Sequence, residues 1–540
     1  MFYPIIRCPE FVWVKTGEGI FPMSPCGEGR FAYRGLLVRC VLDKEGLDVL
    51  LEESSLPVEG VLLRWKEAVA GKNLLLNDHW ERSYGDLQWS TMQPEKVYPW
   101  YFMMFDGSRT HGYGVRTEPN AMCFWQVDGS GLGLWLDVRN GGGGLALTGR
   151  TLTAATVVAR EGKEGESAFA AAKAFCRQMC ARPARPVPYI YGGNNWYYNY
   201  GNSSAGEILD QAQTIADLAG QNRNRPFMVI DDGWQICHSA SCTGGPWSAG
   251  NYKFPHMEEL PARMAEMGVR AGLWFRPLLT SEAAPEEAVL PNSRFLPGLQ
   301  YQYLNGQFLD PSAPYTLEKL AGDMRRFAEW GFQLVKHDFS SCDLFGRWGF
   351  QMGCTLTESG WHLYNRGITN AEAVKGLYHA LRDAAPDLLI MGCNTFGHLS
   401  AGVFDISRTG DDTSGLEWER TRKMGVNTLA FRLPQHGVFY AADPDCVGLT
   451  RAVPWELNRQ WLELVAATGT PLFVSMQLDM MGGEPSKAVA AAFAKADGPA
   501  PDAEPLDWME TSCPARWRFG EEIREFDWYT GEGVRIFSRI

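Results

Sequence analysis

From about residue 189 to about residue 480, short apolar segments alternate with amphipathic helical segments, and this alternation limits the fold more than any other feature. Repeated strand–helix units predict a parallel sheet covered by helices. Eight such units in about 290 residues match the size of a (β/α)8 barrel. The expected strands are residues 188–193, 227–232, 269–275, 332–338, 388–393, 404–410, 437–443 and 470–476.

The regions on either side have a different pattern. Residues 1–185 contain many short apolar or alternating segments separated by glycine-rich turns, which is typical of an antiparallel β-sandwich. The stretch ARPARPVP (181–188) is rich in proline and indicates a linker. We therefore predict a multidomain α/β and β protein. Its domains are an N-terminal sandwich (1–185), a central (β/α)8 TIM barrel (186–482) and a small C-terminal antiparallel β domain (483–540).

Charge and composition exclude several classes of function. The net charge is −13 and no run of five basic residues occurs, so we expect no nucleic-acid partner. No apolar run of about 20 residues is present, so no membrane span is expected. The 13 cysteines are odd in number and the N-terminus lacks the pattern of a signal peptide. These features predict free thiols and a cytoplasmic location.

Polar residues follow seven of the eight predicted barrel strands at their carboxyl ends, where barrels of this kind carry their active sites. Each one alone fits a helix cap equally well. In LVKHD (334–338), Lys336 and Asp338 alternate along the strand, so both side chains can point into the barrel mouth, where the lysine would pair with the aspartate and keep it ionised. The full set is Asn194, Asn195, Trp196, Asp231, Asp232, Trp234, Trp274, Arg276, Lys336, His337, Asp338, Cys393, Asn394, Arg408, Asp411, Asp412, Asp443 and Asp445.

The residue types in this set suit a sugar. Tryptophans stack on the apolar face of a pyranose ring, aspartate and lysine bind hydroxyl groups, and two carboxyl groups cleave a glycosidic bond. Histidines are few, and lysine and arginine compete for the aspartates, so a metal site ranks lower. We expect no metal and no cofactor. Neither a nucleophile elbow nor a phosphate-binding loop is present.

Five motifs over residues 185–480 resemble the α-galactosidase clan of glycoside hydrolases. The resemblance is strongest to glycoside hydrolase family 36, with family 27 as a relative and family 31 more distant. The motifs occur in the family order and are GGNNWYY (192–198), VIDDGWQ (229–235), LVKHD (334–338), GCNTFGHLSAGVFDISRTGDDTSG (392–415) and GTPLFVS (469–475).

The resemblance implies a retaining, exo-acting α-glycoside hydrolase, most like an α-galactosidase, acting on an α-linked oligosaccharide or glycoside. It makes Asp338 the nucleophile and Asp411 the acid/base. Asp412 is a rival, because Asp411 follows Arg408 by one residue fewer than the family pattern has. Members of family 36 often form tetramers, so a homo-oligomer is also expected. Substrate-binding roles fall on Trp196, Asp231, Asp232, Trp234, Trp274, Arg276, Lys336, Cys393, Asn394, Arg408 and Asp412.

The third strand departs from the family pattern. Where the family has Trp-x-Glu-Pro, this chain has WFRP (274–277), and Arg276 is expected to alter substrate contacts in favour of an anionic or differently substituted sugar. The N-terminal loop NDHWERSYGDLQW (77–89) is a candidate to reach the barrel mouth. For Trp80 and Arg82 in this loop, burial in the sandwich is the favoured interpretation.

Several alternatives stay open. The enzyme is an α-galactosidase, an α-N-acetylgalactosaminidase or an α-glucosidase. The reaction is hydrolysis or transglycosylation of the raffinose-synthase kind. A sugar-binding scaffold protein on the same fold is the non-enzyme alternative, and a metal-dependent enzyme is the last.

Overall fold

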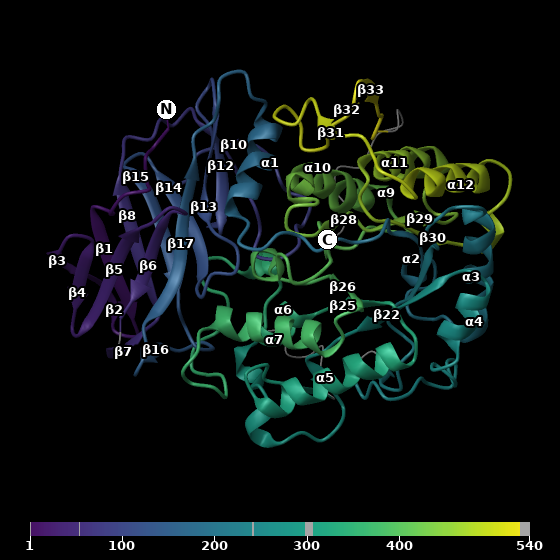
Figure 1. Ribbon diagram of the computed structural model, residues 1–540, viewed down its shortest axis with the longest axis horizontal. Helices are drawn as coiled ribbons and strands as arrows, with labels where there is room; N and C mark the ends of the chain where they lie inside the picture. Colours follow the sequence, from purple (N-terminus) through teal and green to yellow (C-terminus); the bar gives the residue numbers. More distant parts are fainter. Residues whose placement is uncertain (1, 53, 240–241, 298–305, 530–540) are drawn as a thin grey trace.

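The computed structural model describes residues 2–52, 54–239, 242–297 and 306–529 (Figure 1). The N-terminal third is built from strands. They are β1 (Phe11–Thr16), β2 (Gly19–Pro22), β3 (Ser24–Gly27), β4 (Arg30–Tyr33), β5 (Leu36–Leu42), β6 (Leu47–Leu51), β7 (Ser54–Val58), β8 (Gly60–Lys66), β9 (Leu74–Asn77), β10 (Ser90–Thr91), β11 (Tyr98–Pro99), β12 (Tyr101–Phe105), β13 (Thr110–Val115), β14 (Met122–Asp128), β15 (Gly131–Asp137), β16 (Leu145–Leu147) and β17 (Leu152–Arg160).

All of these strands except β7 and β16, which pair with each other, form two large antiparallel sheets. One has the order β11-β14-β15-β8-β1-β2, and the other has the order β10-β9-β12-β13-β17-β6-β5-β4-β3. In β6, and in β5 as far as Cys40, every second residue is buried, as expected for strands with one face on a core. The two sheets meet through aromatic rings, with Phe102 of β12 edge-on to Trp125 of β14 at 5.8 Å between centroids. The predicted antiparallel sheets are therefore present.

A parallel sheet follows the helix α1 (Ala168–Met179). Each of the eight strands predicted from the sequence overlaps one of its strands, and β29 is an addition. The strands are β18 (Tyr191–Asn194), β19 (Phe227–Ile230), β22 (Arg270–Phe275), β25 (Leu334–His337), β26 (Leu389–Gly392), β27 (Ile406–Arg408), β28 (Ala441–Asp443), β29 (Cys446–Leu449) and β30 (Leu472–Met476).

The two edges of the parallel sheet meet. Its order is β28-β27-β26-β25-β22-β19-β18-β30-β29, so β28 lies at one edge and β29 at the other. Only Pro444 and Asp445 separate these two strands in the chain. The sheet therefore curls into a TIM-like barrel whose seventh strand, predicted over 437–443, consists of two pieces, β28 and β29. Asp445 has a φ of 72°, which bends the chain at the interruption.

Helices alternate with the barrel strands and surround them (Figure 1). Two of them begin at residues that cap their first turn, Ser204 for α3 and Thr369 for α7, each accepting a hydrogen bond from the backbone N–H three residues later. The helices are α2 (Trp196–Asn199), α3 (Ala205–Ala219), α4 (Leu260–Glu266), α5 (Pro314–Glu329), α6 (Ser340–Phe345), α7 (Asn370–Ala384), α8 (Gly397–Ser400), α9 (Trp418–Thr421), α10 (Thr428–Arg432), α11 (Trp455–Thr468) and α12 (Glu484–Ala496).

Shorter elements complete the chain. Two further two-stranded pairs are β20 (His238–Ser239) with β21 (Cys242–Thr243), and β23 (Leu279–Thr280) with β24 (Gln307–Phe308). A π-helical turn, Arg422–Asn427, connects α9 to α10. Single 3₁₀ turns span Glu286–Ala288, Asn292–Arg294, Gly349–Gln351, Leu433–Gln435 and Leu478–Met480.

The predicted C-terminal sheet is present as three antiparallel strands, β31 (Ala503–Pro505), β32 (Arg516–Phe519) and β33 (Glu522–Glu525). Its predicted continuation beyond residue 529 lies outside the described residues. Helix α12, which was predicted to belong to the C-terminal domain, packs on α3 and α11 of the barrel. The domain limits at residues 185 and 482 stay predictions.

All 13 cysteines carry free thiols, as their odd number and scattered positions predicted. Among the described residues, no helix combines the length and the apolar character needed to cross a bilayer.

Candidate active site

Three side chains form a buried cluster at the carboxyl ends of β18, β19 and β25. Lys336 Nζ donates to Asp231 Oδ2 at 2.6 Å, and Asn194 Nδ2 donates to the same oxygen at 2.6 Å. Burial alone lowers the pKa of Lys336, but the carboxylate of Asp231 raises it well above its usual value. The expected pairing of Lys336 with Asp338 was wrong, because the long lysine side chain reaches past β22 to the aspartate that follows β19.

Asp338 follows β25 and is held by two donors. Trp274 Nε1 donates to its Oδ2 at 3.0 Å, and the backbone N–H of Phe339 donates to its Oδ1 at 2.8 Å. The same N–H also reaches Asn394 Oδ1 at 3.0 Å, which ties the end of β25 to the end of β26. These contacts fix the orientation of a carboxylate that is almost fully buried.

The residue between Lys336 and Asp338 points the other way. The ring of His337 lies against Phe404 and Tyr378, at 5.3 Å and 5.9 Å between centroids, in the layer outside the barrel. Burial lowers the pKa of His337 to about 4, so its imidazole is neutral near pH 7. The alternation of side chains along this strand is therefore as predicted.

Arg276 is paired inside the protein. Its Nε and Nη2 donate to Asp343 Oδ2 and Oδ1 at 2.8 Å and 2.6 Å, and both side chains are fully buried. Its Nη1 donates to Thr243 Oγ1 at 2.8 Å, and the guanidinium lies 4.0 Å from the centroid of the Phe339 ring. The positive charge expected to favour an anionic sugar is therefore neutralised by Asp343.

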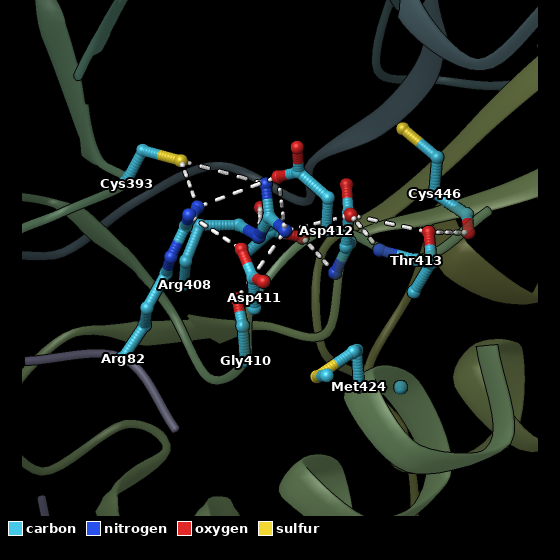
Figure 2. Close-up of polar contacts among 12 residues, drawn as sticks. Arg82, Cys393, Arg408, Gly410, Asp411, Asp412, Thr413, Met424 and Cys446 are labelled. Atoms are coloured by element: carbon cyan, nitrogen blue, oxygen red, sulfur yellow. Dashed lines mark hydrogen bonds and ion pairs between the residues drawn. The ribbon is translucent and has the colours of Figure 1, made fainter. Parts of the chain in front are cut away.

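The loop between β9 and β10, in the N-terminal region, reaches the barrel. The guanidinium of Arg82 pairs with Asp411 Oδ1 at 2.5 Å and with Asp412 Oδ1 at 3.3 Å, and it donates to Cys393 Sγ at 3.3 Å. Figure 2 shows these groups converging on one another. Burial of Arg82 in the sandwich was therefore the wrong expectation, since its partners follow β26 and β27. Trp80 is buried, and its ring lies near Phe124 of the sandwich and His398 of the barrel.

Asp411 and Asp412 differ in their contacts. Both oxygens of Asp411 are in ion pairs, Oδ1 with Arg82 at 2.5 Å and Oδ2 with Arg420 at 2.8 Å, and its side chain is 16% exposed. Asp412 uses only Oδ1, which lies 3.3 Å from Arg82 and 3.4 Å from Arg408, and its side chain is 35% exposed. Burial raises the pKa of Asp412, but the charges of the two guanidinium groups act against burial and hold this pKa well below its usual range.

The interruption of the seventh strand supplies a partner for Arg408. Its Nη2 donates to Asp445 Oδ2 at 2.6 Å, an oxygen that also accepts from the backbone N–H of Thr413 at 2.8 Å and from the hydroxyl of Tyr197. Asp443 Oδ2 lies 4.0 Å from Arg408 Nε. Burial raises the pKa of Asp443 to about 6.

The remaining predicted residues lie after the first two strands. Asp232 Oδ1 accepts from Gln235 Nε2 at 2.6 Å and lies 3.2 Å from His238 Nδ1, which raises the pKa of His238. Trp234 is fully buried, and its indole N–H donates to a backbone carbonyl of β22, so it offers no surface to a substrate. Trp196 is partly exposed at the start of α2.

Three further contributors had little signal in the sequence. Arg420 and Tyr197 reach the cluster from the short helices α9 and α2. Arg82 comes from a loop that precedes its partners by more than 300 residues. This loop (77–89) was predicted as a candidate to reach the barrel mouth, but the favoured prediction for Arg82 was burial in the sandwich.

No family model matches the chain. Solved structures do. An α-galactosidase from Thermus thermophilus, in complex with p-nitrophenyl α-D-galactopyranoside, matches with a TM-score of 0.61 and 19% identity, over 96% of this chain and 99% of that one. The family 36 α-galactosidase AgaA from Geobacillus stearothermophilus matches with a TM-score of 0.58 and 14% identity, over 91% of this chain and 75% of that one. An α-galactosidase from Lactobacillus brevis matches with a TM-score of 0.58 and 15% identity, over 91% of this chain and 73% of that one.

These matches span most of the chain at low identity. The protein therefore has the fold of family 36 α-galactosidases, as the sequence motifs indicated.

Proposed function

We propose that the protein is a retaining, exo-acting α-glycoside hydrolase of the α-galactosidase type. The observation that carries the proposal is the carboxylate of Asp338. It follows a barrel strand, is held by Trp274 Nε1 and the Phe339 N–H, and lies on a fold shared with α-galactosidases. A fold does not prove a function. The proposal therefore depends on the contacts of Asp338 and of the two aspartates that follow β27.

Asp338 acts as the nucleophile. Its carboxylate attacks the anomeric carbon, the glycosidic bond breaks, and a covalent glycosyl-enzyme forms; water then releases the sugar with retained configuration. Lys336 and Asp231, which bond to each other, and Asp232 are available to bind sugar hydroxyls. Trp274 holds Asp338 in position through its indole N–H. The chemistry needs only the protein's own side chains and water.

The contacts favour Asp412 over Asp411 as the acid/base. Both oxygens of Asp411 are tied to arginines, which leaves no free oxygen to meet the leaving group. For Asp412, no residue in the described part of the chain forms a hydrogen bond or an ion pair with Oδ2. As a general acid, Asp412 must gain a proton in the substrate complex, so sugar contacts that draw Arg82 or Arg408 away would raise its pKa. Asp411 then serves to hold Arg82.

Galactose is the proposed sugar. The Thermus enzyme was also solved with stachyose, and a variant of AgaA with raffinose; both ligands carry terminal α-galactose. A panel of p-nitrophenyl α-glycosides tests the choice. We expect the highest kcat/KM with the α-galactoside, and a clear preference for the α-N-acetylgalactosaminide or the α-glucoside would reassign the sugar.

Matched variants of the two neighbouring aspartates test the acid/base. Asp412→Ala should lower turnover of raffinose roughly 100- to 10,000-fold, the contribution expected of a general acid. Its hydrolysis of p-nitrophenyl α-galactoside should be accelerated by azide, with α-galactosyl azide as product. Asp411→Ala is the control and should form no azide adduct. The opposite result, with azide rescue confined to Asp411→Ala, would return the role to Asp411.

A further inference from the structure

A cavity of about 190 Å³ lies on the six-stranded sheet of the N-terminal region. Residues of β1, β2, β8, β14 and β15 line it together with Arg139, Glu59 and Cys354. None of these residues belongs to the strand-end cluster of the barrel. In Figure 1 the strands β1, β8, β14 and β15 lie side by side in the sandwich.

The cavity has an aromatic wall. Trp135 of β15 is partly exposed and stacks on Phe124 of β14, with centroids 6.1 Å apart and an interplanar angle of 16°. The Trp135 indole N–H donates to Gln126 Oε1 at 3.0 Å, which fixes the orientation of the indole. Within the described part of the chain, no group accepts a hydrogen bond from the Gln126 amide nitrogen. The wall therefore combines a fixed ring with two unused N–H donors.

Arg139 adds a charged donor that is almost fully buried. It is 4% exposed, and its Nε and Nη2 both bond to the carboxylate of Asp137. None of the residues that the structure describes accepts from Nη1. Because Arg139 lines the cavity, the N–H groups on Nη1 are available there to a ligand or to water.

The charges around the cavity cancel. Arg139 and Asp137 form one ion pair, and Lys15 Nζ lies 3.3 Å from Glu59 Oε2 in a second. An anionic or cationic ligand would meet a group of its own sign, and a wholly apolar ligand would leave the Arg139 donor unpaired. A neutral ligand with many hydroxyl groups and one apolar face satisfies both the polar side chains and the indole.

We propose that this cavity binds one ring of a neutral hexopyranoside, as a carbohydrate site separate from the catalytic one. The ring stacks on Trp135 and its hydroxyls take up the free donors of Arg139 and Gln126. The volume suits a single ring, since pockets for drug-sized ligands enclose about 300–1,000 Å³. The proposal does not depend on the activity of the barrel.

Cys354 on the cavity wall makes the proposal testable. Both Cys354 and Cys26 are exposed, and only Cys354 lines the cavity. The protein is alkylated with iodoacetamide, with and without raffinose, and labelling of each cysteine is followed by peptide mass spectrometry. At ten times the dissociation constant, raffinose should slow the labelling of Cys354 about tenfold, because only the unbound fraction reacts. Labelling of Cys26 should not change.

Two variants complete the test. Trp135→Ala, or Gln126→Ala if the first folds poorly, should abolish the protection of Cys354. Asp338→Ala should leave protection intact, so this result is independent of whether the barrel is a hydrolase. The proposal is overturned if methyl α-galactopyranoside, sucrose and raffinose all fail to protect, or if protection survives Trp135→Ala. Protection that depends on protein concentration and not on sugar would overturn it too, and would assign the face to a second copy of the chain.

Discussion

Phe339 follows the proposed nucleophile with a φ of 65°, a region in which a non-glycine residue costs on the order of 1–3 kcal/mol. Its N–H reaches the Asp338 carboxylate, so the strained backbone bears directly on the site. The guanidinium of Arg276 lies over the Phe339 ring and is fixed in turn by Asp343. We infer that the Arg276–Asp343 pair is a positioning device, which explains an arginine where the family pattern has glutamate.

If the Arg276–Asp343 pair positions Phe339, a double variant should recover stability without recovering turnover. Arg276→Met leaves the Asp343 carboxylate buried without its partner and should destabilise the protein by about 3–5 kcal/mol. Replacing both residues, as Arg276→Met with Asp343→Leu, should restore most of the melting temperature. In the double variant the Phe339 ring no longer packs against a guanidinium. We therefore expect kcat on p-nitrophenyl α-galactoside to stay roughly 10- to 100-fold below that of the parent, with KM little changed. Recovery of kcat together with stability would show that the pair is only structural.

At the scale of elements, the loop between β9 and β10 is attached to the barrel along its length. The backbone N–H of Ser83 donates to the Thr409 carbonyl at 2.9 Å, and the N–H of Asp411 donates to the Ser83 carbonyl at 2.8 Å. Further along, Asn427 bonds to both backbone groups of Leu87. The N-terminal region therefore contributes to the candidate site, and Arg82 reaches its partners only if this loop is docked.

Gly85 allows the docking. It has a φ of 77°, and a Cβ at this position would lie 2.7 Å from Lys423 Cβ and 2.8 Å from the Lys423 carbonyl oxygen. Gly85→Ala should therefore displace the loop and lower kcat/KM at least tenfold, because a shift of about 1 Å in a site can cost 100-fold. Gly71→Ala is the matched control, since its Cβ meets nothing within 4 Å. Equal activity of the two variants would contradict a role for the docked loop.

For the whole molecule, the sequence predicts the architecture better than it predicts the partners. The eight barrel strands were predicted from their periodicity, which depends only on neighbours in the chain. The strand β29 was missed because Pro444 and Asp445 signal the end of a strand. Side-chain alternation indicated correctly that Lys336 points inward, but its pairing with Asp231 depends on how far apart the strands lie in the barrel. The contacts of Arg82 depend on the docking of two regions.

Stability of the whole molecule should depend on Asp443. Its pKa is raised from 3.8 to about 6, so between these pH values the native state keeps a proton that the unfolded state has lost. Stability therefore falls as the pH rises through this window. Asp443→Asn should remove this cost and be more stable than the parent at pH 7 by on the order of 2–3 kcal/mol. Thermal melting of the variant and the parent at pH 4.5 and 7.5 measures this difference in stability. If the difference does not grow with pH, the raised pKa of Asp443 is contradicted.

The central claim is that Asp338 forms a covalent bond to the sugar, and trapping that bond tests it most directly. The protein is incubated with a fluorinated α-galactosyl fluoride that forms the glycosyl-enzyme quickly and releases it slowly, and is then digested and sequenced by mass spectrometry. We predict one fluorogalactosyl group per chain, attached to the carboxylate of Asp338. Attachment to another residue, or turnover of an α-galactoside with inverted configuration and no adduct, would contradict the account.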